Sequence, residues 1–293
     1  MSLLGRIVLA LALYVGSGAL GDSSSPGASA AGTLRGRILY SSFHSSALRG
    51  TVHYSVYLPP GYERSRKRYP VVYFLHGLPA DATSYRDIDR VAAAVERSGH
   101  PAIVVGAQGA RAGDTDPEWR DWGPSRNWET ATVTELVGVV DRRYRTIATR
   151  SGRLLVGVSA GGYGATLIAL HNPGVFGVVE SWSGYFHATT PDGSASLDLG
   201  SRDADEWANA YKLVSRVKRF LRWTGGRSYL AFYVGDADAL FRDENVAYAS
   251  ELRAAGVDRA VFRLYSGGHD WNLWASHATA WLSRGLAIAA PAA

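Results

Sequence analysis

Short apolar segments alternate with helical patterns along most of this chain, and the alternation limits the folds that the chain can adopt. A run of about five apolar residues bounded by turn signals is typical of a strand buried on both faces of a sheet. Strands that alternate with helices form a mainly parallel sheet with helices on both faces, so the sequence predicts an α/β fold. The expected strands are residues 71–75, 102–105, 154–158, 175–180, 229–234 and 261–264, and the expected helices are residues 85–97, 129–144, 160–171, 205–223, 243–255 and 272–287.

Two other segments have different patterns. Residues 34–40 and 51–58 predict an opening antiparallel pair, because the second alternates apolar residues with period two before a Pro-Pro-Gly turn. Residues 184–227 are longer than a crossover connection needs, and we interpret them as a small cap over the site.

The composition suits one large globular domain, with 293 residues of which 46% are apolar and 19% are charged. The net charge of +5 raises the question of a nucleic-acid partner. Of the 31 basic residues only Lys67, Lys212 and Lys218 are lysines, and the arginines are scattered rather than gathered on one face. The densest group, Arg64 to Arg68, falls in an expected solvated turn, so we expect no nucleic-acid partner.

Residues 1–31 have the pattern of a signal peptide followed by a disordered leader, which leaves residues 32–293 for the domain. Arg6 supplies a short positive region, and residues 7–20 form an apolar stretch too short to span a membrane comfortably. The chain has no Cys, which excludes a lipoprotein anchor, disulfides, thiolate metal sites and a Cys nucleophile. We expect a secreted protein without stable membrane association after cleavage; an uncleaved anchor is the alternative.

The segment Gly157-Val158-Ser159-Ala160-Gly161 follows an expected buried strand and opens an expected helix. This strand-turn-helix context is that of a nucleophile elbow, whose sharp turn lifts the Ser hydroxyl clear of the sheet. The small glycines let strand and helix approach, and the helix N-terminus directs N–H groups at charge that develops beside the Ser. Ser159 is therefore the candidate nucleophile.

A Ser nucleophile needs a base and an acid, which in such a fold follow it on loops after later strands. His269 lies on a Gly-rich loop directly after the last expected strand and is the candidate base. Asp236 and Asp238 both follow the strand before it, and their positions alone do not separate them as the acid. The other Asp would cap a helix or bond backbone N–H groups. His277 falls within the last helix, where we expect a structural role.

The oxyanion that forms during acyl transfer needs two N–H donors. The first is expected from Ala160, directly after the nucleophile, and the second from the loop after the strand at residues 71–75. In that loop Gly77 permits a tight turn, Leu78 offers an N–H and Pro79 has none. Leu78 and Ala160 are therefore the candidate oxyanion donors, and a purely structural His76 loop is the alternative.

Four segments of the chain resemble the esterase D family of α/β-hydrolases, which includes feruloyl and acetyl xylan esterases, formylglutathione hydrolases and the antigen 85 mycolyltransferases. They are residues 56–62, 69–77, 157–162 and 267–271, in the family's order and spacing, and the resemblance extends from about Gly36 to the last helix. On the family pattern the acid position falls on Asp238. The resemblance implies an α/β-hydrolase fold, ester chemistry, and neither a metal nor an organic cofactor.

The resemblance also separates branches of the family. The mycolyltransferases have an Asp-Gly pair where this chain has His76-Gly77, and the formylglutathione hydrolases are cytoplasmic, unlike a chain with an export signal. We therefore expect an exported serine carboxylesterase, with a carbohydrate or aryl ester as a candidate substrate. The alternatives are an acyltransferase that passes the acyl group to a sugar or lipid alcohol, and a non-catalytic binding protein on a hydrolase scaffold.

Several tryptophans fall in expected loops near the site. Their rings could stack on a sugar or an aryl acid, but Trp also packs loops, and we favour packing for each of them. They are Trp119, Trp122, Trp128, Trp182, Trp271 and Trp274.

Overall fold

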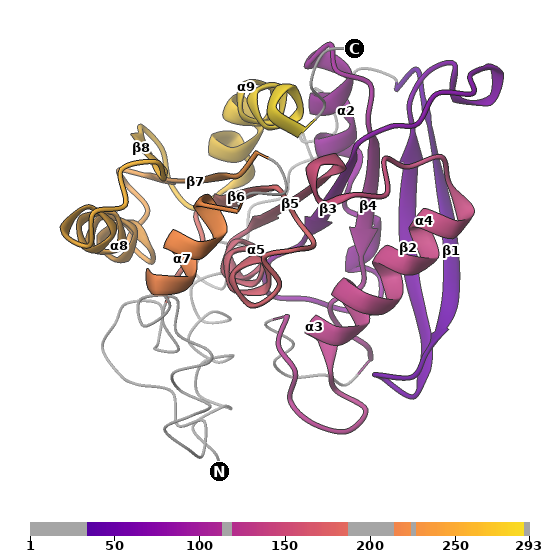
Figure 1. The fold of residues 1–293 in the computed structure, drawn as a ribbon, viewed down its shortest axis with the longest axis horizontal. Coiled ribbons are helices and arrows are strands. Elements are labelled where there is room, and N and C mark those ends of the chain that lie inside the picture. The colour runs from indigo at the N-terminus through magenta and orange to yellow at the C-terminus, as the bar shows by residue number, and fades with distance from the viewer. Residues whose placement is uncertain (1–33, 113–118, 187–213, 224–226, 290–293) are drawn as a thin grey trace, which may run out of the picture.

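The computed structural model describes residues 34–112, 119–186, 214–223 and 227–289 (Figure 1). Residues 1–31, expected to be a signal peptide and leader, and most of the expected cap lie outside these ranges. Eight strands form one sheet in the order β1-β2-β4-β3-β5-β6-β7-β8. The strands are β1 (Arg37–Ser45), β2 (Gly50–Leu58), β3 (Val71–Leu75), β4 (Ile103–Ala107), β5 (Arg153–Val158), β6 (Val178–Trp182), β7 (Tyr229–Gly235) and β8 (Val261–Tyr265).

The sheet is mainly parallel, as predicted. β2 pairs antiparallel with both β1 and β4, and the remaining pairs are parallel. The helices described are α2 (Asp89–Arg97), α3 (Trp128–Thr130), α4 (Val137–Arg143), α5 (Ala160–His171), α7 (Val214–Leu221), α8 (Arg242–Ala254) and α9 (Trp271–Ala289). In the described part of the chain, none of them is both long and apolar enough to cross a membrane.

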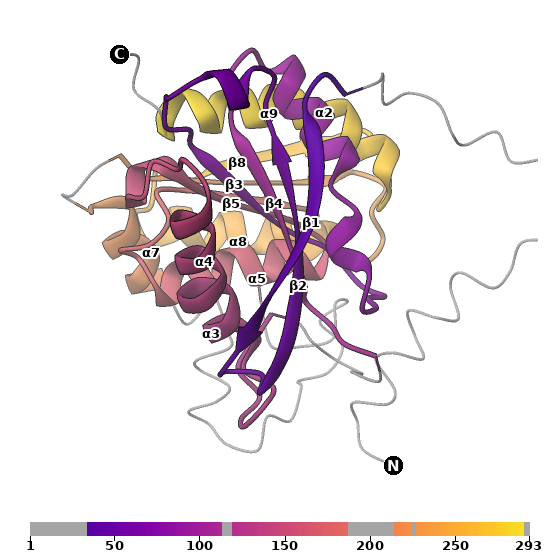
Figure 2. The ribbon, with the colours of Figure 1, turned by 90° about the vertical axis from the view of Figure 1, so that its right-hand side faces the viewer.

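Two hydrophobic cores lie on opposite faces of the sheet. Figure 2 shows α2 and α9 on one face and α4, α5, α7 and α8 on the other. Successive strand residues point to opposite faces, so Val72 packs in the core with α2 and α9 while Tyr73 packs in the core with α5. Because both faces are covered, β3 is buried along its whole length, which explains its wholly apolar sequence.

Several element boundaries differ from the predictions. The helix expected at residues 129–144 is interrupted by a π-helical segment, η3 (Ala131–Leu136), between α3 and α4. The strand expected at residues 175–180 begins only at Val178, because Val175 closes a turn on the carbonyl of Asn172. Trp182 is thus the last residue of β6 rather than part of the following loop. The helix expected at residues 85–97 begins at Asp89, since residues 84–86 form a separate 3-10 turn.

The carboxyl ends of the parallel strands meet at one edge of the sheet, where α/β proteins build their ligand sites. The candidate residues follow β3, β5, β7 and β8. The topology therefore brings all four segments to the same edge.

Candidate active site

Ser159 occupies the tight turn between β5 and α5, with φ 55° and ψ −124°. Non-glycine residues rarely adopt a positive φ, and such strain costs about 1–3 kcal/mol. The turn is possible because the neighbouring glycines lack side chains: a Cβ on Gly157 would lie 2.1 Å from the carbonyl oxygen of Gly161. The Ser159 N–H donates to the carbonyl of Trp182 at 2.9 Å, which ties the turn to the end of β6. The hydroxyl is thereby held at the carboxyl edge of the sheet.

His269 links the serine to an acid. Its Nε2 lies 3.0 Å from Ser159 Oγ, and its Nδ1 lies 2.8 Å from Asp238 Oδ2. A carboxylate accepts hydrogen bonds, so Nδ1–H donates to Asp238 and the lone pair of Nε2 faces the serine hydroxyl. Ser159 and His269, which the sequence indicates as nucleophile and base, and Asp238, which the family resemblance indicates as acid, therefore form one hydrogen-bonded chain.

The two aspartates of the acid loop have different partners. Asp238 is 1% exposed, and its second oxygen, Oδ1, accepts the N–H groups of Leu240 and Phe241 at 3.1 Å each. Asp236 is exposed, and its Oδ1 accepts the Gly267 N–H at 3.1 Å. Asp236 thus bonds the backbone of the loop that carries His269, whereas Asp238 contacts the imidazole itself.

The loop after β3 lies against the serine. A Cβ on Gly77 would come within 2.9 Å of Ser159 Cβ, so only glycine fits there. The buried His76 imidazole accepts the Gly109 N–H at Nε2 (3.1 Å) and lies 2.9 Å from the Gly77 carbonyl at Nδ1. Nδ1 therefore carries the proton and donates it to that carbonyl. Burial lowers the pKa of His76 to about 4, which keeps the ring neutral at physiological pH.

The His76 bond also orients the peptide that joins Gly77 to Leu78. The C=O and N–H of a trans peptide point in opposite directions, so the Leu78 N–H points away from His76. On the other side of the serine, Ala160 is the first residue of α5, and first-turn N–H groups have no acceptor within the helix. Leu78 and Ala160 remain the predicted oxyanion donors.

The tryptophans differ in how far they are buried. Trp119 is buried, its ring lies 4.8 Å from that of His76, and its Nε1–H donates to the His76 carbonyl at 3.1 Å. Trp119 therefore packs against the loop after β3. The sequence alone does not indicate this role, because Trp119 lies far from that loop along the chain. Trp128 and Trp182 are also fully buried, whereas Trp122 and Trp271 are half-buried. The last-helix residue His277 stacks on Tyr265 at 3.6 Å, in keeping with a structural role.

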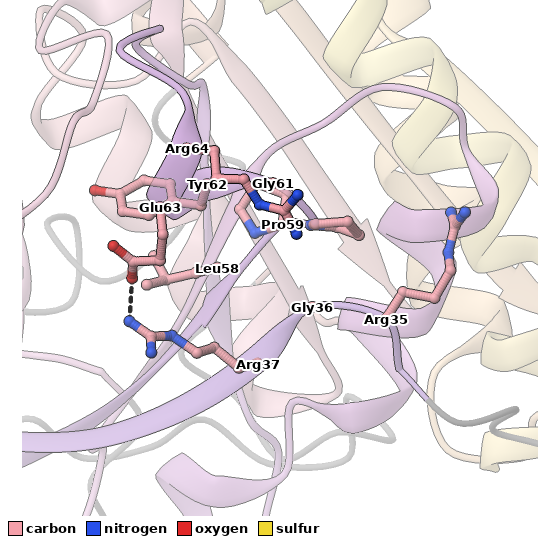
Figure 3. A pocket seen from close by; sticks show the side chains of 10 residues that line it. Arg35, Gly36, Arg37, Leu58, Pro59, Gly61, Tyr62, Glu63 and Arg64 are labelled. Atoms are coloured by element: carbon pink, nitrogen blue, oxygen red, sulfur yellow. Dashed lines mark hydrogen bonds and ion pairs between the residues drawn. The ribbon is translucent and has the colours of Figure 1, made fainter.

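A pocket of about 200 Å³ lies at the opposite edge of the sheet (Figure 3). Its walls come from the start of β1 and the turn after β2, where Arg37 forms an ion pair with Glu63. Leu58 pairs with Arg37 at this end, beside the beginnings of β3 and β4. The pocket is therefore remote from Ser159. Within the described ranges, no group of three or more His, Asp or Glu side chains could hold a metal ion.

Comparison with known proteins gives related sequences over part of the chain. The model of the family described as Putative esterase matches residues 45–283. Esterase Rv1288 of Mycobacterium tuberculosis (strain ATCC 25618 / H37Rv) is 35% identical over 149 residues, which are 50% of this chain and 32% of that protein. The endo-1,4-beta-xylanase/feruloyl esterase of Xylanibacter ruminicola is 30% identical over 134 residues, 42% of this chain and 18% of that protein. The chain thus spans about a third or less of the length of these relatives.

Solved structures match over nearly the whole chain. A ferulic acid esterase superposes with a TM-score of 0.70 and 27% identity, covering 86% of this chain and 99% of that one. An S-formylglutathione hydrolase from Agrobacterium tumefaciens has a TM-score of 0.71 at 20% identity, covering 88% of this chain and 98% of that one. The second likeness shows the fold alone. Together they confirm the predicted α/β-hydrolase fold.

Proposed function

This chain belongs to the putative esterase family, and we propose that it is an exported serine carboxylesterase that works through an acyl-enzyme on Ser159. The observation that carries the proposal is the unbroken hydrogen-bonded chain from Asp238 through His269 to the Ser159 hydroxyl. A serine hydroxyl is a weak nucleophile without such a base, and an oriented imidazole removes its proton during attack.

The reaction proceeds in two balanced halves. Ser159 Oγ attacks the ester carbonyl carbon while His269 Nε2 takes its proton, and the Leu78 and Ala160 N–H groups bind the oxyanion. Collapse breaks the bond to the alcohol oxygen, and His269 gives its proton to the departing alcohol. Water then attacks the acyl-enzyme, His269 accepts a proton from it, and the acid leaves as that proton returns to Ser159. Asp238 holds the imidazolium in both halves.

For the substrate we propose an ester of an aryl acid, with a carbohydrate as the alcohol. This rests on the likeness at 27% identity to a ferulic acid esterase that the chain matches almost end to end, and on the match to the xylanase/feruloyl esterase. The feruloyl, acetyl and aliphatic esters of p-nitrophenol or methanol, assayed in parallel, test the choice. A preference for the aliphatic esters over the feruloyl ester would overturn it.

The nucleophile is tested by Ser159→Ala, for which we expect a loss on the order of a million-fold in kcat. Ser283→Ala, on α9 and away from the site, is the matched control and should retain full activity. Retention of more than a few per cent of activity by purified Ser159→Ala would refute the assignment. Assays with an added sugar acceptor distinguish a hydrolase from an acyltransferase, because only an acyltransferase would pass the acyl group to the sugar. If the protein neither hydrolysed the esters nor was labelled by a fluorophosphonate, it would be a binding protein.

Export is tested on the full-length protein produced by its own organism. We expect the mature protein to begin between about residues 21 and 32, because the apolar stretch at residues 7–20 suits cleavage better than spanning. N-terminal sequencing of protein from the culture medium gives the cleavage site. Full-length chain found only in the membrane fraction would identify the segment as an anchor.

A further inference from the structure

Three aromatic rings form a buried stack beside the proposed triad, and we refer to Tyr163, Tyr185 and Phe241 as the aromatic column. Tyr163 and Tyr185 stack with ring centroids 4.6 Å apart and planes within 10°. Tyr185 and Phe241 stack at 5.4 Å and 14°. All three residues are at most 4% exposed. The column joins α5, which carries the nucleophile at its start, to the segments that follow β6 and β7.

Phe241 contacts both the acid and the base of the proposed triad. Its ring centroid lies 4.7 Å from that of the His269 imidazole, with the planes tilted by 47°. Its backbone N–H donates to Asp238 Oδ1 at 3.1 Å, on the carboxylate whose other oxygen bonds His269. Among the described residues, Phe241 thus touches the acid with its backbone and the base with its side chain.

A second ring contacts the imidazole from α9. Trp274 lies edge-on to His269, at 5.1 Å and 90°. Its Nε1–H donates to Ser183 Oγ at 3.0 Å, and the Ser183 N–H donates to the Tyr233 carbonyl at 2.8 Å. The indole is therefore anchored to the ends of β6 and β7, and its position against the imidazole is fixed by the sheet.

These ring contacts restrict a rotation of the His269 imidazole that its two hydrogen bonds do not restrict. Bonds at Nδ1 and Nε2 fix the line through the imidazole, but the ring can still tilt about that line. Packing against rings held by other elements removes this freedom, and aromatic rings also attract the positive charge that the imidazole gains when it takes a proton.

We propose that Phe241 is a positioning residue that holds the His269 imidazole in line between Asp238 and Ser159, with Trp274 as its counterpart. This inference rests on the proposed function. Misplacement of a reacting group by about 1 Å costs roughly a hundredfold in rate. We therefore expect Phe241→Leu to lower kcat per active site by about ten- to a hundredfold, with little change in KM.

The concentration of active sites is first titrated with a fluorophosphonate, and kcat is then calculated per titrated site. A variant that is only partly folded therefore does not give a falsely low kcat. Phe232→Leu is the matched control: Phe232 is equally buried on β7, but its ring contacts Phe186, Tyr248 and Phe262. It should lose a similar amount of thermal stability and keep kcat. Phe241→Tyr, which retains the ring, should restore most of kcat.

A proton NMR spectrum adds a readout that a merely structural role would not change. The downfield resonance of the His269 proton bonded to Asp238 should shift or broaden in Phe241→Leu and stay unchanged in Phe232→Leu. If Phe241→Leu does not fold, Phe241→Met takes its place, because the flexible Met side chain fills irregular gaps in a core better than Leu does. Equal kcat per titrated site in the Phe241 and Phe232 variants would overturn the inference. If Ser159→Ala remained active, the proposed function would fail instead.

Discussion

Glu180 on β6 is a fully buried carboxyl that the proposed reaction does not use. Its Oε2 accepts the Trp182 Nε1–H at 3.2 Å, and no residue in the described part of the chain donates a hydrogen bond to its Oε1. A Cβ on Gly285 of α9 would lie 2.6 Å from Oε1, so the carboxyl sits directly under that helix. Burial raises the pKa of Glu180 to about 8, and the bond from Trp182 opposes this only in part.

The sign and size of the effect on stability follow from linkage. An acid whose pKa is higher in the folded state binds its proton more tightly there, so its stabilising contribution is complete below the ordinary pKa of 4.5. The contribution declines as the pH rises and is lost as the pH passes about 8. A difference of about 3.5 units at about 1.4 kcal/mol per unit gives a loss of about 5 kcal/mol between pH 4.5 and pH 9.

Glu180→Gln removes the ionisation and keeps the shape. The amide oxygen of Gln can still accept the Trp182 Nε1–H, so variant and wild type should be similarly stable at pH 5. At pH 9 the variant should be more stable by several kcal/mol, measured by urea unfolding at pH 5, 7 and 9. Glu63→Gln is the control, because Glu63 is an exposed partner of Arg37 and its effect should not vary over this range. An equal difference between Glu180→Gln and wild type at pH 5 and pH 9 would refute the reasoning.

Three further predictions concern the site and its support. Asp238→Asn should lower kcat on the order of ten-thousand-fold with the fold intact. Asp236→Asn should lower the free energy of unfolding by about 1 kcal/mol and change kcat little. Kinetic assays and urea unfolding of both variants test this prediction. His76→Ala, which frees the Gly77 carbonyl, should lower kcat about a hundredfold at similar KM, and His76→Asn should recover part of the loss in the same assay. Arg150→Ala removes a buried guanidinium that donates to three backbone carbonyls and a hydroxyl. It should lower the free energy of unfolding by about 2–4 kcal/mol, measured by urea unfolding, and the folded fraction should keep its kcat.

The strands were the most predictable part of the structure. β3 has the predicted bounds because a strand buried on both faces needs apolar residues throughout, and it is bounded by Pro70 on one side and by His76-Gly77 on the other. The turn at Ser159 was equally readable, since two glycines at close approach and an adjoining helix leave few other conformations. The start of β6 moved because the apolar Val175 lies in a turn. β1, expected at residues 34–40, begins at Arg37 and continues to Ser45, because residues 41–45 also pair with β2 although most of them are polar.

The choice between Asp236 and Asp238 could not be made from the residues. Both follow β7 by a few positions, and periodicity says nothing about which way a loop side chain points. In the structure Asp236 turns outward to the Gly267 N–H, and Asp238 turns inward to the imidazole. The family pattern selected Asp238, which agrees with this geometry, but its catalytic role stays a prediction until the two variants are compared.

The tryptophans show most directly what the fold adds to the sequence. Each near the site had the same two interpretations, stacking on substrate or packing a loop, and the ring's burial and its N–H partner separate them. The indole N–H groups of Trp119, Trp182 and Trp274 donate to protein acceptors, and their rings are buried, so these three residues have a packing role. Trp271 is half-buried, lies two residues from His269, and has the Arg90 guanidinium 4.8 Å from its ring. The Trp271 ring also packs against Phe74 and Trp274, with centroids 6.3 and 5.4 Å apart, so packing explains its position as it does for the buried tryptophans.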